Sequence, residues 1–78
     1  MEPEQARHRV ATRIRELSAR RRLSLNALAE QAGTAQSYLY AVLAGEKSPT
    51  VDWLARIAET LRVDIHELLR PPRRAKGP

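Results

Sequence analysis

One glycine, Gly33, stands between two short stretches of helical patterning, and this arrangement restricts the possible folds more than any other feature. Before the glycine, apolar residues recur three and four positions apart, which is the spacing of one face of a helix. A second stretch with similar spacing begins directly after it. Because glycine readily adopts the left-handed conformation that ends a helix, we expect two short helices joined by a tight turn.

The same spacing, bounded by capping residues, predicts an all-α, compact five-helix domain. Ser, Thr and Asp are favoured before a helix because their side chains accept hydrogen bonds from its first free amides. The predicted helices cover residues 4–21, then the segments from Ser24 to Gly33, from Thr34 to Gly45, from Thr50 to Leu61, and from Asp64 to Leu69. No stretch combines strict alternation with β-branched residues, so strands are not expected.

The length of 78 residues fits a single compact domain, which we place at residues 1–70. Pro71 and Pro72 stop the last helix, and the residues that follow offer little apolar surface for packing. Residues 71–78 are therefore predicted to form a disordered basic tail.

The chain contains no cysteine, so disulfides and thiolate metal sites are excluded. This absence fits a reducing compartment, and the start of the chain lacks the apolar block of a signal peptide. No apolar run approaches the ~20 residues that span a bilayer. We therefore expect a cytoplasmic protein that uses no cofactor and does not act at a membrane.

Charge is distributed unevenly along the chain. Fourteen Lys and Arg against nine Asp and Glu give a formal net charge of +5, and a basic small domain is typical of nucleic-acid binders. Residues 1–22 and 70–78 each carry a net charge of +4, whereas residues 23–69 carry −3. The overall charge therefore indicates nucleic acid no more strongly than it indicates simple solubility.

The paired short helices point more clearly to DNA. In helix-turn-helix proteins, the second helix enters the major groove while the first lies across the backbone. The relevant residues here are the run Leu23–Gly33, then Ser37-Tyr38-Leu39, Gly45, Pro49-Thr50 and the segment Leu61–Leu69. With these spacings, roughly residues 10–70 resemble the Cro/phage-repressor family, also called the xenobiotic-response-element type. The resemblance implies a domain that binds double-stranded DNA as a homodimer and regulates transcription.

The resemblance also implies roles for individual residues, with the recognition helix at about residues 35–43. Gln36 falls where relatives commonly place a base-reading side chain, and a Gln amide can pair with N6 and N7 of adenine. The other base-contact candidates are Ser37, Ala41 and Tyr40. The phosphate-contact candidates are Ser24, Tyr38, Lys47, Arg13 and Trp53, with Trp53 acting through the amides that open the fourth helix while its ring lies partly in the core.

The apolar residues of the last predicted helix are expected to join two subunits. These residues are Ile65, Leu68 and Leu69. A two-fold dimer would place its half-sites about 34 Å apart, which is one turn of the DNA helix.

The chain departs from the family pattern at three positions. Leu25 replaces a Gln that bonds the DNA backbone in relatives, and Leu cannot donate a hydrogen bond. Leu43 and Ser18 replace a Glu and an Arg that form a buried ion pair in many relatives. Because both partners are missing together, apolar packing can take the place of the pair, and the fold is expected to survive.

Two other functional classes can be compared with the DNA-binding interpretation. An enzyme is not expected, because His8 and His66 lie far apart and capping already explains Asp64. The stronger alternative is a protein-interaction module or an antitoxin component with the same fold. It is favoured by residues 34–45, which contain no Lys or Arg.

Overall fold

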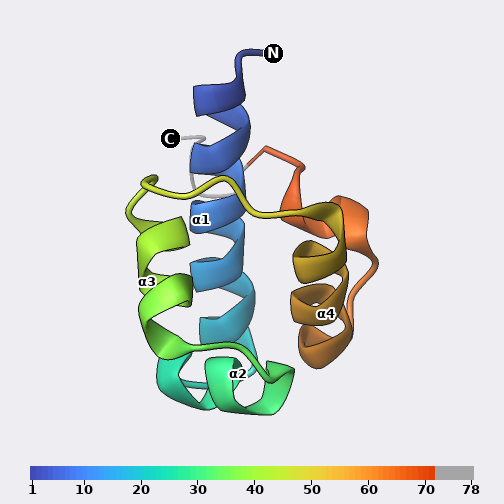
Figure 1. Cartoon of the computed structure of the whole chain (residues 1–78). Coiled ribbons are helices and arrows are strands. Elements are labelled where there is room, and N and C mark those ends of the chain that lie inside the picture. Colours follow the sequence, from blue (N-terminus) through green and yellow to red (C-terminus); the bar gives the residue numbers. More distant parts are fainter. Residues whose placement is uncertain (72–78) are drawn as a thin grey trace.

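The computed structural model describes residues 1–71 and shows four α-helices followed by one turn of 3-10 helix. The elements are α1 (Pro3–Arg20), α2 (Leu25–Ala32), α3 (Gln36–Leu43), α4 (Val51–Leu61) and η1 (Ile65–Leu68) (Figure 1). The all-helical class is confirmed, and the described residues contain no strand. The predicted basic tail lies, from residue 72 onward, outside the described part of the chain.

The expectation of five α-helices is wrong at the last element. Asp64 does open it, and its carboxylate accepts a hydrogen bond from the His66 amide over 3.0 Å. The element then completes a single 3-10 turn and ends at Leu68. Pro71 follows closely, and a proline cannot supply the amide hydrogen that a longer helix would need.

Besides Asp64, two predicted caps are confirmed, and one is wrong. Ser24 Oγ accepts from the Ala27 amide at 3.1 Å, and Thr50 Oγ1 accepts from the Trp53 amide at 3.0 Å. Thr34 does not cap α3, because Ala35 occupies that position and makes no side-chain bond. The Thr34 hydroxyl instead accepts from Nε1 of the Trp53 indole over 2.8 Å, which ties the turn after α2 to α4.

The core is formed where the helices enclose α1. In Figure 1, α1 runs through the middle of the molecule, with α3 on one side and α4 on the other, and α2 crosses near the C-terminal end of α1. Each helix contributes one buried apolar stripe, as its spacing predicted. The side chains with no solvent exposure are those of Ile14, Leu28, Ala29, Leu39, Ile57, Leu61 and Leu68.

Arg13 was expected near DNA phosphates, and the structure contradicts this. Its side chain is only 1% exposed, between α1 and η1. Nε donates to the Glu67 carbonyl at 2.7 Å, and Nη2 reaches the Glu67 carboxylate at 2.9 Å. Nη1 is 2.7 Å from Glu16 Oε1. Arg13 therefore holds the last turn against α1 and is not accessible to a phosphate.

The expectation that Leu68 joins two subunits is also wrong. Leu68 has no solvent exposure and belongs to the core of a single subunit. Because a 3-10 turn advances about 120° per residue, the residues after Asp64 do not form the single stripe of an α-helix. Leu69 is 39% exposed, and Ile65 is half-buried against the core.

Candidate nucleic-acid interface

The first turn of α3 presents two exposed polar side chains. Leu39, Val42 and Leu43 are buried and hold one face of α3 against the domain. Gln36 and Ser37 are exposed, and within residues 1–71 no hydrogen bond restrains either side chain. An exposed amide and hydroxyl at the start of an anchored helix match what base reading in a major groove requires.

A hydrogen bond across the turn joins α2 to α3. The Tyr40 hydroxyl, on α3, donates to Asn26 Oδ1, on α2, over 2.8 Å. The Tyr40 ring remains 43% exposed, and Ala41 beside it is half-buried. This pair could not be predicted from the sequence, because the partners lie 14 residues apart in different helices.

Tyr38 lies at the boundary between the exposed surface and the core. Its half-buried ring contacts the indole of Trp53 edge-on, with 5.4 Å between the ring centroids and 72° between the planes. Edge-to-face contacts of this kind stabilise aromatic pairs beyond the area they bury. Together with the Thr34–Trp53 bond, this contact fixes the start of α3 to α4.

The start of α4 offers fewer free amides than the sequence suggested. The Trp53 amide is already bonded to the Thr50 hydroxyl, and the indole is only 7% exposed. Trp53 is therefore wrong as a phosphate contact, whereas the amides of Val51 and Asp52 precede the capped position. The Asp52 carboxylate suits the helix dipole, but it would repel a phosphate placed there.

The surface formed by the two helices and the following loop carries little positive charge. Between Ser24 and Trp53 the only cation is Lys47, which is exposed in the loop before α4. Glu30, Glu46 and Asp52 give this segment a net charge of −2. Ser24 is exposed and close in sequence to the exposed arginines at the end of α1, which place positive charge near the start of α2.

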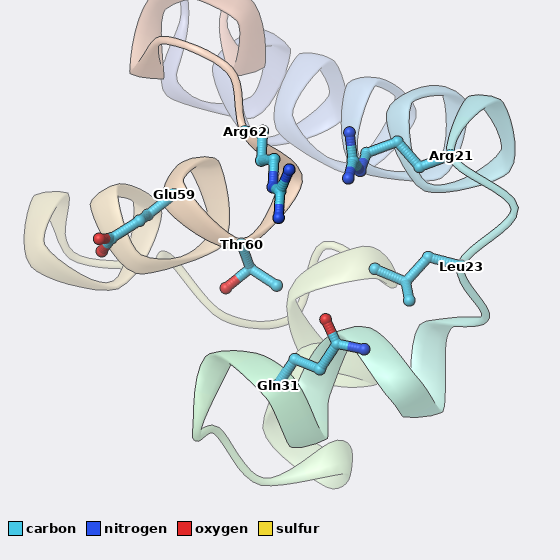
Figure 2. Close-up of a pocket in the computed structure, with 6 residues that line it drawn as sticks. All are labelled: Arg21, Leu23, Gln31, Glu59, Thr60 and Arg62. Atoms are coloured by element: carbon cyan, nitrogen blue, oxygen red, sulfur yellow. The ribbon is translucent and has the colours of Figure 1, made fainter.

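A hollow of the described residues lies elsewhere. It has a volume of about 420 Å³, and Figure 2 shows the guanidinium groups of Arg21 and Arg62 inside it while the Glu59 carboxylate points away. Gln31 lines it from the last turn of α2. Gln31 lies five residues, or about 140° around the helix, from Asn26, so the hollow faces away from α3.

Three helices end around this hollow, which explains its arginines. The last turns of α1, α2 and α4 all border it. Helix C-termini carry partial negative charge, so the guanidinium groups of Arg21 and Arg62 stabilise these ends. Arg62 also occupies the left-handed cap position of α4, with a φ of 58°.

The described residues contain no group of three His, Asp or Glu side chains placed to hold a metal ion. No helix among residues 1–71 has both the length and the apolar character needed to cross a bilayer.

The geometry places the chain in a known class. The profile of the helix-turn-helix domain family matches residues 9–70, which is most of the chain. The chain therefore belongs to the helix-turn-helix domain family and is a DNA-binding regulator of transcription by class. The resemblance to Cro/phage-repressor proteins is confirmed.

Several solved structures share this fold. A hypothetical transcription factor from Neisseria gives a TM-score of 0.84 at 24% identity, over 96% of this chain and 86% of that one. The restriction-modification controller protein C.AhdI from Aeromonas hydrophila gives 0.75 at 27% identity, over 80% and 94%. SinR, a master regulator for biofilm formation solved in complex with DNA, gives 0.73 at 32% identity, over 78% and 98%. A comparison with curated protein sequences finds no match.

Proposed function

We propose that the protein binds specific sites in double-stranded DNA with the first turn of α3 in the major groove. The observation that carries this proposal is the exposure of Gln36 and Ser37 on a helix whose opposite face is buried. Gln36 would pair with adenine through N6 and N7, and Ser37 can accept from or donate to a base edge. Ala41 and Tyr40 are the remaining base-contact candidates on the same helix.

The phosphate contacts proposed for this complex are few. Ser24, Lys47 and the Tyr38 hydroxyl keep the roles expected from the sequence. Only Lys47 among these side chains is charged. Since each phosphate neutralised adds about −0.9 to the slope of log affinity against log salt, we expect a shallow slope for this protein.

The experiment that tests this function is selection of binding sites from random duplexes, followed by titration of salt on the selected site. The proposal predicts enrichment of one sequence and an affinity that falls with salt. If no sequence is enriched and no duplex binds at low salt, DNA recognition by α3 is contradicted.

We also propose that the protein acts as a homodimer. Leu69 is exposed next to an apolar hollow of about 180 Å³, which Val10 and Pro49 also line. Ile65 remains the second candidate, because its side chain is only half-buried. Leu69→Glu should convert a dimer to a monomer in sedimentation measurements. A monomer before substitution, both free and on DNA, would contradict the dimer.

A second candidate function is the protein-interaction module, including an antitoxin component. The observation that favours it is the uncharged outer face of α3, which carries Tyr40 and no Lys or Arg. Such a protein would bind a partner with little dependence on salt and would give no enriched sequence in the selection described above.

The remaining proposals follow from the regulator function. The relatives with solved structures named above are regulators, and we infer that this chain likewise acts by binding and not as an enzyme. The cytoplasm stays the expected location, because a regulator must reach the DNA that it controls.

A further inference from the structure

The hydrogen bond from Tyr40 to Asn26 leaves the NH₂ group of the exposed Asn26 side chain free to bind a ligand. An Asn side chain has an acceptor oxygen and an NH₂ group with two donors. Tyr40 occupies the oxygen, and no described residue bonds the NH₂ group. The oriented end of Asn26 is therefore a pair of hydrogen-bond donors at the junction of α2 and α3.

The position of this amide suits an anion. Asn26 is the second residue of α2, where the helix dipole favours negative charge. Ser24 already satisfies the amides of Ala27 and Leu28 through its side chain and carbonyl. Leu25, next to Asn26, is half-buried against the core and offers no side-chain donor. Asn26 is thus the one side-chain amide in the first turn of this helix, beside the Ser24 hydroxyl.

We propose that the Asn26 amide donates to a phosphate oxygen of the DNA backbone and that Tyr40 is the residue that positions this amide. The inference rests on the proposed function, because α2 lies across the backbone only when α3 occupies the groove. It assigns Tyr40 a positioning role in place of base reading. The inference also explains how residues 24–53 can contact DNA although Lys47 is their one cation. A neutral hydrogen-bond donor takes the place of a charged one.

The first test compares two amide-to-acid substitutions in α2. Asn26→Asp keeps the oxygen that accepts from Tyr40 and replaces the donors with negative charge. Because an acid near a helix N-terminus stabilises the helix, a loss of binding will not come from unfolding. We expect affinity for a labelled duplex of mixed sequence to fall by about tenfold. Gln31→Glu, on the far side of α2, makes the same chemical change and should leave affinity nearly unchanged.

The second test separates positioning from stability. Tyr40→Phe removes only the hydroxyl and should weaken DNA binding by about threefold, since the Asn26 side chain must then be ordered on binding. In an Asn26→Ala background, the same substitution should have no further effect on binding. A structural role for the bond would instead lower the melting temperature of Tyr40→Phe, and a direct contact of the Tyr40 hydroxyl with DNA would weaken binding equally in both backgrounds; either result would overturn the positioning role.

The outcomes distinguish the inference from the function on which it rests. Unchanged binding by Asn26→Asp would overturn the inference alone. A loss confined to the selected site, with mixed-sequence DNA unaffected, would overturn it as well, because Asn26 would then read a base. Failure of the unsubstituted protein to bind any duplex would overturn the proposed function together with the inference.

Discussion

The junction of α1 with η1 and the outer face of α3 use polar side chains in opposite ways. At the junction, Arg13 is buried, and each of its guanidinium nitrogens bonds to Glu16 or Glu67. On α3, Gln36 and Ser37 are exposed, and no hydrogen bond among residues 1–71 fixes them. The difference shows that an arginine expected at the DNA, Arg13, can instead stabilise the fold. The surface proposed to read bases carries uncharged side chains.

The largest effect in this comparison should come from removing the buried charge. Arg13→Met leaves the Glu67 carbonyl without its donor and removes the Arg13 bonds to the Glu16 and Glu67 carboxylates. Breaking a buried pair on one side costs about 3–5 kcal/mol. The melting temperature should fall by at least ~10 °C. Arg15→Met is the matched control, because Arg15 is exposed on the same helix. Equal small shifts in the two variants would show that Arg13 is not a structural tie.

The next largest effect should appear at the reading surface and only in binding. Gln36→Ala should weaken binding to the selected site by ~1–3 kcal/mol, with little change on mixed-sequence DNA. The melting temperature should not change, because the side chain is exposed. Gln31→Ala, measured by the same titration, controls for loss of a Gln from a nearby helix. Equal weakening of both kinds of duplex by Gln36→Ala would refute base reading.

Ser18→Ala should have a smaller effect on stability, because it removes a buried hydroxyl that has no hydrogen-bond partner among the described residues. Ser18 Oγ is buried, and no described residue bonds it. Since an unsatisfied buried hydroxyl is costly and Ala favours helix, Ser18→Ala should stabilise the protein by about 1 kcal/mol in urea unfolding. A destabilisation of that size would mean that the hydroxyl is bonded in solution, and the contrast with Arg13 would then be weaker.

The smallest expected effect is the change in the free energy of unfolding with pH that comes from the carboxylates of the last turn. Hydrogen bonds from the backbone and side chain of His66 lower the pKa of Asp64 from its ordinary 3.8. The hydrogen bond from Arg70 is the main cause that lowers the pKa of Glu67 from 4.5. A lowered folded pKa contributes stability above the ordinary value and loses it as pH falls through the folded pKa.

The free energy of unfolding should therefore be flat from neutral pH to about 4.5 and decline below it. Glu67→Gln should reduce the decline, and Gln5→Glu, which adds a carboxylate outside this cluster, should not. A decline that begins near pH 7 would assign the dependence to other groups.

The local features of the fold could be predicted from the sequence, and the long-range ones could not. Ser24, Gly33 and Thr50 were predicted correctly as helix boundaries because each acts on amides or carbonyls a few residues away. Thr34 was not, because its hydroxyl accepts from an indole 19 residues later. Arg13 was misjudged for the same reason, since its partner Glu67 lies 54 residues along the chain.

The site was predicted to a similar extent. Placement of Gln36 and Ser37 on an exposed turn followed from the helical period and the family pattern, because both describe one helix. The bond from Tyr40 to Asn26 depends on the angle between two helices, which spacing does not fix. Leu68 was misassigned because its side chain packs into the core of its own subunit, and apolar spacing does not tell whether such a face meets the core or a second subunit.

The claim that Gln36 reads a base in the major groove has one direct test. Replacing the adenine opposite Gln36 in the selected site with 7-deazaadenine removes the N7 acceptor and leaves base pairing intact. The unsubstituted protein should lose about tenfold in affinity for the altered duplex, whereas Gln36→Ala should bind both duplexes equally. If the two proteins lose the same amount, or if neither loses any, the contact between Gln36 and adenine does not exist.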